Sequence, residues 1–373
     1  MELVVVLMVI LFIYALFERF FHQRNLNKIP IRIMVNGTRG KTSTTRMLYA
    51  SLKQSGLTVM AKTTGSDAVL ILPDGTEQNY RKPKRIITLY EQIPFVRMAV
   101  KNKVDVIVVE CMALQRESQL AMAQYYICPT HMILTNAYVD HIEEIGATTE
   151  ETIDTLSLSI PKNCVVVSGE ERFKPYAKIY VPLLELPAYF SADKFTYPVV
   201  ESNCKAVLTL CNYLGINEII ALEGMYNSMP DIGMRGPFVL NDKHVFHNVF
   251  AANDVISAQE QIQKTKRLNA KTIIVYNHRQ DRLYRLKQYY TLFTDLSKQG
   301  ATIYIMGDYN KKVTSVLRKK CNANVQSFPK EIQLFLTSLP NECIDIYGIG
   351  NIKGPGEQLI KTLQILTTKG DVA

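Results

Sequence analysis

The sequence lacks the features that mark a disulfide-stabilised, repetitive or disordered protein. Its seven cysteines are scattered, and no two of them form a C-x-x-C pair. Because a disulfide framework or a zinc knuckle needs paired cysteines, we expect reduced cysteines in the core of a cytosolic domain. The six histidines form no metal-binding cluster of their own, and the sequence contains neither a repeat of fixed period nor a low-complexity segment.

Charge is present in moderate amount and is partly clustered. Charged residues make up 21% of the chain and hydrophobic residues 47%, the proportions of a packed globular protein. The formal net charge is +9, with basic runs at 81–85 and 318–320 that most often form solvated surface. Such an excess favours an anionic partner (a nucleotide, an acidic lipid headgroup or a polyanionic substrate) without choosing among them. A length of 373 residues favours two domains over one.

The longest uncharged stretch lies at the amino terminus. Residues 3–17 read LVVVLMVILFIYALF and are followed by a Glu-Arg pair and two phenylalanines. As a helix extended to Phe21, this stretch is ~28 Å long, close to the hydrocarbon thickness of a bilayer. Basic residues follow it within 19–32, so the positive-inside rule places the body of the chain in the cytoplasm. We therefore predict that residues 1–22 form a single-span membrane anchor.

The same stretch has three alternative interpretations. A signal peptide carries positive charge before its apolar run and an A-x-A-like cleavage site after it. Here the only early charge besides the terminal amine is Glu2, and no such site follows. A buried core helix is the second alternative. An interfacial helix is the third, and it stays open because the run is slightly short for a span.

Short apolar runs alternate with helical stretches after Pro30. The runs are aliphatic or β-branched, end in polar residues and are typical of buried strands. Such alternation indicates parallel sheets covered by helices, so we predict an α/β fold. A glycine- and proline-rich segment at 233–237 divides the alternation into two series, which gives α/β domains at 30–235 and 236–373. The expected strands are 31–35, 104–109, 131–135, 272–276, 302–306 and 344–347, and the expected helices are 41–54, 283–299, 312–321 and 331–339.

A phosphate-binding loop is predicted where the first strand meets the first helix. Residues 36–44 read N-G-T-R-G-K-T-S-T. Glycines let the turn bring backbone N–H groups against phosphate oxygens, the helix amino terminus adds its dipole, and Lys41 supplies a point charge. The hydroxyl of Thr42 would ligate Mg²⁺. Val35 stands where the common G-x-x-x-x-G-K-[ST] pattern has glycine, so the loop fits the tighter G-T-x-G-K-T form; a chance glycine-rich helix start is the alternative.

Two further strand ends extend the predicted nucleotide site. Glu110 closes the strand at 104–109, where the carboxyl end of a parallel strand faces the phosphates. The next strand ends in T-N-A-Y-V-D-H at 135–141, where a carboxylate and an imidazole could hold a second Mg²⁺. Taken singly, Glu110 as an N-cap or ion pair and His141 as a structural histidine are equally good interpretations. The phosphate loop beside them favours the nucleotide site.

These features, in this order, resemble the Mur ligase superfamily of ATP-dependent amide-forming enzymes. The matching residues are G-T-R-G-K-T-S-T at 37–44, Glu110 and T-N-x-x-x-D-H at 135–141. Three later segments also resemble parts of this family. S-N-C-K-A at 202–206 is similar to its H-N helix, and M-R-G at 234–236 is similar to its hinge between central and carboxy-terminal domains. N-V-F-A-A-N-D at 248–254 is similar to its N-A-N-P-x-S segment.

The resemblance becomes more specific with the apolar amino terminus, N-H-R-Q-D-R at 277–282 and G-x-G-N-x-x-G-x-G at 348–356. Together these resemble the membrane-anchored ligase subunits of bacterial poly-γ-glutamate synthases, which serve capsule biosynthesis, and the similarity covers nearly the whole chain. It implies a P-loop parallel-sheet ATPase domain like the Mur ligase central domain. It also implies a smaller Rossmann-like α/β carboxy-terminal domain, and a place in the bacterial cell membrane.

The resemblance also implies chemistry and residues. ATP and Mg²⁺ would serve to phosphorylate a carboxylate of glutamate or of a growing γ-glutamyl chain, which an amine then attacks. Catalytic roles would fall to Lys41, Glu110, His141 and Arg279, and Mg²⁺ would be held by Thr42, Glu110 and His141. For Arg279 and Arg282, ordinary surface arginines are a nearly equal alternative. The residues implied in nucleotide binding are Asn36, Gly37, Thr38, Arg39, Gly40, Lys41, Thr42, Ser43, Asn136, Asn203, Arg235, Asn253 and Arg282.

Some features depart from the family pattern. Peptidoglycan Mur ligases carry an additional amino-terminal domain for the UDP-sugar, whereas here the ATPase core follows the anchor almost directly. Asp254 and Val255 stand where many members have a nearby proline, and the lysine that is often carbamylated has no assignable counterpart. A folylpoly-γ-glutamate synthase-like ligase shares the chemistry but does not call for an anchor. A ParA-type nucleotide switch would have a lysine near the start of its loop, where this chain has Asn36 and Thr38.

The expected partners follow from the same resemblance. They are glutamate or the growing γ-glutamyl chain, and other membrane subunits of a synthase and export complex. A homo-oligomer stays open, and we expect no nucleic acid partner.

Overall fold

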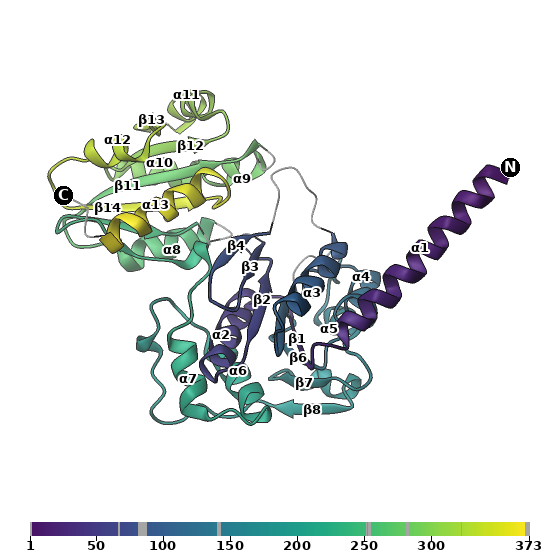
Figure 1. Cartoon of the computed structure of the whole chain (residues 1–373). Helices are drawn as coiled ribbons and strands as arrows, with labels where there is room; N and C mark the ends of the chain where they lie inside the picture. The colour runs from purple at the N-terminus through teal and green to yellow at the C-terminus, as the bar shows by residue number, and fades with distance from the viewer. Residues whose placement is uncertain are drawn as a thin grey trace. The chain divides into compact units, whose positions relative to one another are not determined.

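The computed structural model divides the chain into two compact units, Met1–Met229 and Pro230–Ala373 (Figure 1). The residues it describes are 2–65, 68–80, 88–139, 143–250, 252, 255–280, 283–321 and 323–369. Each unit is a mainly parallel sheet with helices on its faces, so the predicted α/β fold is confirmed. The break between units falls a few residues before the predicted boundary at 235/236.

Unit 1 contains an eight-stranded sheet whose order is β4-β3-β2-β5-β1-β6-β7-β8. β3 pairs antiparallel with β2 and with β4, and the other pairings are parallel. The strands β2, β5 and β7 are buried along their whole length, as expected for a sheet covered on both faces. The strands are β1 (Ile31–Asn36), β2 (Val59–Thr63), β3 (Val69–Ile71), β4 (Glu77–Asn79), β5 (Val106–Glu110), β6 (His131–Leu134), β7 (Val165–Ser168) and β8 (Ile179–Pro182).

Helices cover both faces of this sheet. One face carries the end of α1 (Glu2–Leu26), α3 (Gln92–Lys101) and α5 (Thr149–Ser157), whose apolar side chains share one core with the strands. The other carries α2 (Lys41–Gln54), α6 (Glu201–Tyr213) and α7 (Glu218–Tyr226). A Cβ at Gly224 would lie 2.5 Å from Cα of Ser51, so α7 crosses α2 closely enough to need glycine. Shorter helical pieces are η1 (Leu89–Glu91), α4 (Arg116–Ala121), η2 (Met122–Tyr126), η3 (Glu171–Tyr176) and η4 (Ala192–Lys194).

Unit 2 contains a six-stranded sheet whose order is β13-β12-β11-β14-β10-β9. β9 pairs antiparallel with β10 and the other pairings are parallel. The strands are β9 (Phe238–Val239), β10 (His244–Asn248), β11 (Lys271–His278), β12 (Thr302–Gly307), β13 (Val325–Ser327) and β14 (Ile344–Gly350). The helices are η5 (Ile232–Met234), α8 (Val255–Thr265), α9 (Leu283–Gln288), α10 (Tyr290–Lys298), α11 (Asn310–Cys321), α12 (Ile332–Thr337) and α13 (Pro355–Lys369).

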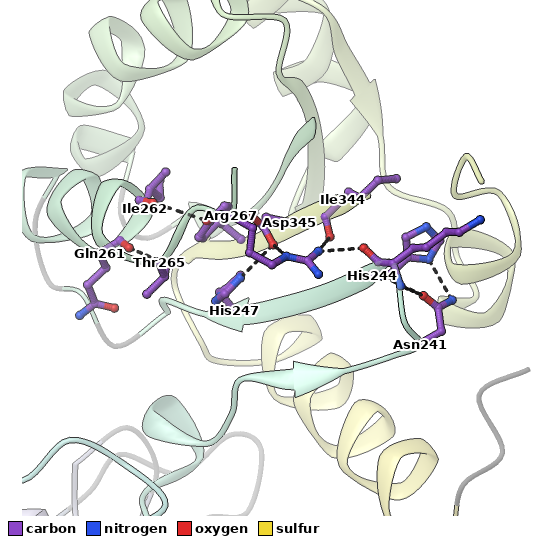
Figure 2. A network of polar contacts seen from close by, with 11 residues as sticks. Asn241, His244, His247, Gln261, Ile262, Thr265, Arg267, Ile344 and Asp345 are labelled. Carbon is purple, nitrogen blue, oxygen red and sulfur yellow. Dashed lines mark hydrogen bonds and ion pairs between the residues drawn. The ribbon is translucent and has the colours of Figure 1, made fainter. Parts of the chain in front are cut away.

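A buried ionic network ties the strands of unit 2 together near the start of β14 (Figure 2). Asp345 has no exposed area and accepts hydrogen bonds from the backbone N–H and from Nε of Arg267, both at 2.7 Å. Nε2 of His247 lies 3.3 Å from the same carboxylate. Burial lowers the pKa of His247, and Asp345 partly opposes that shift. The network therefore fixes the loop after α8 onto β10 and β14.

The amino-terminal helix is longer than predicted. The residues from Leu3 to Phe17 are all exposed, whereas His22 and Leu26 are buried. Among the described residues this is one helix long and apolar enough to cross a membrane. The helix ends at Leu26, and its last turns belong to the core of unit 1.

The seven cysteines are free, as predicted. Five are buried, Cys128 is half-buried, and Cys343 is exposed.

Candidate active site

The predicted phosphate loop lies at the carboxyl edge of the unit 1 sheet. β1 is flanked by β5 and β6, and its register pairs Val35 with Glu110 and Asn36 with Leu134. The chain leaves β1 here, forms the loop at 37–40 and enters α2 at Lys41, the helix start that the sequence predicted. The chain leads from β1 to β2 on one side and from β5 to β6 on the other, so the connections after these adjacent strands diverge. Such a point is where α/β sheets form the crevice that binds ligands.

Both glycines of the loop are required by its geometry. Gly37 has φ of 125°, and a Cβ there would lie 2.2 Å from Oγ1 of Thr135. Gly40 has φ of 82°, and a Cβ there would lie 2.5 Å from Nδ2 of Asn203. A side chain at either position would collide with the domain and strain the backbone. Val35 is a buried residue of β1, so the tighter loop begins only after the strand ends.

Asn136 holds the loop backbone in place. Its Oδ1 accepts hydrogen bonds from Oγ1 of Thr38 at 2.8 Å and from the N–H of Arg39 at 3.0 Å. Its Nδ2 donates to the carbonyl of Arg39, also at 3.0 Å. The hydroxyl of Thr135 donates to that carbonyl at 2.7 Å. The loop is therefore preorganised by the end of β6.

Asn36 braces the loop from below. Its Nδ2 donates to Oε1 of Gln119 at 2.8 Å and to Oγ of Ser159 at 2.9 Å, and its Oδ1 accepts from the N–H of Gly37 at 2.8 Å. Because both amide protons are used inside the domain, the side chain positions the loop.

Lys41 lies over the loop. Its Nζ donates to the carbonyl of Gly37 at 2.6 Å and to that of Thr38 at 3.2 Å. This places an ammonium beside the backbone N–H groups of the loop. Ser43 and Thr44 continue the first turn of α2, and the Thr44 side chain is fully buried.

Glu110 brings together three segments of unit 1. It is only 3% exposed, and Oγ1 of Thr42 lies 3.0 Å from each of its carboxylate oxygens. The backbone N–H of Thr64 donates to Oε2 at 2.7 Å. A carboxylate and a hydroxyl are the hard oxygen ligands that Mg²⁺ prefers, so the chemistry of this pair fits the predicted metal. His141, the third predicted ligand, lies outside the described residues, as do Asn253 and Arg282.

Thr64 and Gly65 are site residues that sequence reasoning missed. They follow β2, and a Cβ at Gly65 would lie 2.3 Å from Oγ1 of Thr42. The contribution of Thr64 is a backbone N–H, which no side-chain pattern reveals. A Thr-Thr-Gly-Ser run at 63–66, which begins at the last residue of a buried strand, was the available signal.

A cavity of about 630 Å³ opens beside the loop, within the size range of small-molecule sites. Its wall includes Asn136 from the end of β6 and Ser202 and Lys205 from the start of α6. Lys205 pairs with Glu185 at 2.7 Å and with Glu201 at 3.1 Å. Asn203, which lies between Ser202 and Lys205 on α6, is buried against Gly40. The predicted residues Asn136 and Asn203 therefore both lie at the loop, and Asn136 also lines this cavity.

Lys62 is a buried charge near the same edge. It sits one residue before the end of β2, has no exposed area, and its Nζ lies 3.3 Å from Oε2 of Glu91 and 4.4 Å from the ring centre of Tyr80. Burial lowers its pKa to about 8, and Glu91 limits the shift. No pattern in the sequence singled this lysine out.

In unit 2, polar groups gather at the carboxyl ends of β11 and β14. Nδ2 of Asn277 donates to the carbonyl of Asn351 and, at 2.9 Å, to that of Lys353. Nη1 of Arg285 donates to Oδ1 of Asn351 at 3.0 Å. Arg279 follows β11 and is half-buried. The segments at 277–280 and 348–356 therefore meet at one edge of this sheet.

Arg235 lies at the start of unit 2. Its Nε donates to the carbonyl of Pro230 at 3.2 Å and its Nη1 to Oε1 of Gln364 at 2.9 Å. These contacts fix its guanidinium within its own unit.

Comparison with known proteins places both units in one family. The Mur ligase middle domain matches residues 35–160, and the poly-gamma-glutamate synthase CapB C-terminal domain matches residues 237–366. The capsule biosynthesis protein CapB of Bacillus anthracis is 30% identical over 375 residues, covering 94% of this chain and 80% of that protein. The chain belongs to the CapB family.

A second CapB protein and several solved structures agree with this membership. PGA synthase CapB of Bacillus subtilis (strain 168) is 28% identical over 387 residues, covering 97% of this chain and 98% of that protein. Folylpolyglutamate synthase of Thermotoga maritima has the same fold, with TM-score 0.59, 14% identity and coverage of 100% and 99%. MurF of Acinetobacter baumannii has TM-score 0.63, 14% identity and coverage of 93% and 79%. Escherichia coli FolC in complex with ADP has TM-score 0.62, 13% identity and coverage of 94% and 92%.

Membership of the CapB family confirms the predicted superfamily and the predicted class of enzyme. The chain is an ATP-dependent amide ligase. This activity replaces the ParA-type switch as an interpretation of the phosphate loop. Arg285, which the sequence reasoning did not single out, lies within the part matched by the CapB C-terminal domain, as does Asn351 of the G-x-G-N-x-x-G-x-G segment.

Proposed function

We propose that this CapB-family chain polymerises glutamate through γ-linkages, with conversion of ATP to ADP and phosphate. The observation that carries the proposal is the pairing of Thr42 with Glu110 at 3.0 Å beside the glycine loop, in a chain that matches CapB proteins over almost its whole length. A folylpoly-γ-glutamate synthase-like activity shares this chemistry. The exposed apolar helix α1 favours the polymer, because a soluble pteridine substrate does not need a membrane anchor.

The proposed reaction has two steps. A carboxylate oxygen of glutamate, or of the growing chain, attacks the γ-phosphorus of ATP, and the bond to the bridging oxygen breaks to release ADP. The amine of another glutamate then attacks the acyl carbon, the acyl C–O bond breaks, phosphate leaves, and the nitrogen loses a proton. Such chemistry depends on positioning and on neutralising phosphate charge more than on a nucleophilic side chain.

The residues of unit 1 supply that positioning. The backbone N–H groups of the loop at 37–40, fixed by Asn136, point toward phosphate oxygens as donors. Lys41 exchanges its bonds to the Gly37 and Thr38 carbonyls for the β- and γ-phosphates. Thr42 and Glu110 would hold Mg²⁺, which neutralises phosphate charge when bound. His141 is proposed as a further metal ligand, and Arg279 and Arg282 as cations over the transferring phosphate.

The same proposal assigns a location. The helix α1 spans the bacterial cell membrane once, with the catalytic body in the cytoplasm, because basic residues follow the apolar stretch. Other membrane subunits of a synthase and export complex are the proposed partners.

Incubation of membranes containing the chain with ATP, Mg²⁺ and labelled glutamate tests the proposed function. We expect labelled polymer that a γ-glutamyl-specific hydrolase degrades and an α-specific peptidase leaves intact. A product degraded only by the α-specific peptidase, or glutamate added to a pteridine and not to itself, would contradict the proposal.

A further inference from the structure

The first part of helix α1 is exposed, and its end packs against unit 1. Its first half extends away from the rest of the unit, and the residues from Leu3 to Phe17 are exposed (Figure 1). Its last turn ends at Leu26, which has no exposed area and shares a core with Phe95 and Val96 of α3. No glycine or proline interrupts residues 2–29. The helix therefore continues from the apolar stretch into the domain without a flexible segment.

Polar contacts reinforce the junction. The hydroxyl of Tyr90, just before α3, donates to Oε1 of Glu18. The ring of His22 bonds through Nε2 to the carbonyl of Tyr126 at 2.9 Å. Below the helix, Nη1 of Arg32 donates to the carbonyl of Leu26 at 3.2 Å and to that of Ile29 at 2.7 Å. The carbonyl of Leu26, the last residue of α1, is therefore capped by Arg32, which stiffens the connection.

Basic and aromatic side chains from the four elements α1, η1, α3 and η2 lie near the point where the apolar stretch ends. We call Arg19, Tyr90, Arg97 and Tyr125 the collar. Both arginines are exposed, Tyr90 is 43% exposed, and the ring of Tyr125 packs on His22 with centres 5.6 Å apart. Arg97 lies on α3, which contacts α1. Tyrosine and arginine are the side chains that favour the headgroup layer of a membrane.

The direction of α1 relates the collar to the active site. A short turn at 27–30 joins α1 to β1, and β1 is parallel to β5. A short turn at 102–105 joins α3 to β5, so both helices run opposite to that strand. The exposed half of α1 therefore points to the side of the unit where β5 ends at Glu110.

We propose that α1 is a rigid strut and that the collar seats unit 1 on the anionic headgroup layer of the membrane, with the phosphate-loop edge of the sheet turned toward the bilayer. The charge of the two exposed arginines complements acidic headgroups, and the two tyrosines suit the interface between water and hydrocarbon. This inference rests on the membrane anchor of the proposed function. Its consequence is that the ligase works at a fixed distance from the lipid surface.

The absence of tryptophan in the chain makes a direct test available. The variant Tyr125→Trp places the sole tryptophan in the collar, and Tyr90→Trp is a second probe if the first disturbs the fold. Tyr189→Trp is the matched control, because Tyr189 is 52% exposed and hydrogen-bonded to Glu218 at the start of α7, on the other face of the sheet. Each full-length variant is reconstituted in phosphatidylcholine–phosphatidylglycerol vesicles, and its fluorescence is compared with and without brominated lipid.

We expect brominated lipid to quench the two collar probes and to leave the control unquenched. When Arg19→Glu and Arg97→Glu are added to a collar-probe variant, the equilibrium constant for contact of the collar with the lipid surface should fall at least about fivefold per charge. Quenching by brominated lipid should fall accordingly. A chain that stays bound to vesicles while both collar probes remain unquenched overturns the inference and leaves the anchor intact. A chain that does not float with vesicles contradicts the anchor itself. Quenching that requires native membranes and fails in pure lipid would assign the collar to a protein partner and overturn the lipid seat.

Discussion

Glu110 shows how one residue joins separate parts of the chain into a site. Its carboxylate contacts the hydroxyl of Thr42 at the start of α2 and the N–H of Thr64 after β2. Because the side chain is almost fully buried, the negative charge is held where the phosphate loop ends. A metal bound here would face ligands that are already in position.

Replacing that charge without changing its shape tests the role of Glu110. In Glu110→Gln the amide oxygen can still accept from Thr64, so we expect the melting temperature to change little. Turnover of ATP at saturating Mg²⁺ should fall about 10²–10³-fold, the typical cost of removing one preorganised electrostatic group. Steady-state ADP release measures the effect. Turnover equal to that of the unmodified chain would contradict the assignment.

Lys62 gives a prediction of pH dependence. Its pKa is about 8 in the folded chain and near 10.5 when unfolded, so the unfolded chain binds the proton more tightly between these values. The cost of burying the charge is therefore fully present below pH 8 and disappears as the pH rises toward 10.5. Relative to Lys62→Met, the unmodified chain should gain up to ~3 kcal/mol of stability over this range. Urea unfolding of both chains at several pH values checks this, and a constant difference would contradict it.

At the scale of elements, the network around Asp345 stabilises the start of β14 against β10. Asp345→Ala would remove a fully buried carboxylate that accepts two hydrogen bonds from Arg267, whose side chain is 36% exposed, and we expect a loss of about 1.5–3 kcal/mol. Asp295→Ala is the matched control, because Asp295 is 56% exposed and lies 3.9 Å from Lys298. The control should change stability by no more than about 0.5 kcal/mol. Equal effects of the two substitutions on urea unfolding would show that the buried network has no special role.

The end of α1 predicts where the chain tolerates truncation. Removing residues 2–17 should give a soluble chain that folds and binds nucleotide, because these side chains contact solvent rather than the core. Removing residues 2–26 also deletes His22 and Leu26, and the lost burial of Leu26 alone should cost about 2–3 kcal/mol. Thermal unfolding and nucleotide binding compare the two. The structure thus places the best truncation point at residue 17, before the predicted anchor end at residue 22. Equal destabilisation by the two deletions would contradict this.

Some elements could be predicted from the sequence and others could not, for physical reasons. The helix at 41–54 was predicted to the residue, because a glycine opens it and the change of period is sharp. The hairpin of β3 and β4 was missed, because strands of three residues carry almost no periodic signal. One helix was expected at 283–299, whereas the chain forms α9 and α10 with Tyr289 buried between them. The break depends on the tertiary packing of Tyr289, which the local sequence pattern does not reveal.

In the candidate site, the residue types that the chemistry requires could be predicted, whereas roles that depend on the fold could not. Lys41, Thr42 and Glu110 were predicted as a group, because phosphate and metal chemistry restricts which side chains serve. The bracing role of Asn36 depends on Gln119 and Ser159, which are distant in sequence and meet only in the fold. The N–H of Thr64 is a backbone group, so its identity carries no information about its role. His141, Asn253 and Arg282 lie outside the described residues and stay predictions.

For the molecule as a whole, the central claim is that ATP cleavage is coupled to a glutamate carboxylate. An acyl-phosphate ligase holds its intermediate away from water until an amine arrives, so hydroxylamine should intercept it. The most direct measurement is the yield of γ-glutamyl hydroxamate, with parallel ADP release, from membranes containing the chain, with and without glutamate. The account predicts glutamate-dependent ADP release, hydroxamate from the unmodified chain, and neither from Lys41→Ala at unchanged fold. Equal ATP hydrolysis with and without glutamate, and no hydroxamate, would contradict it.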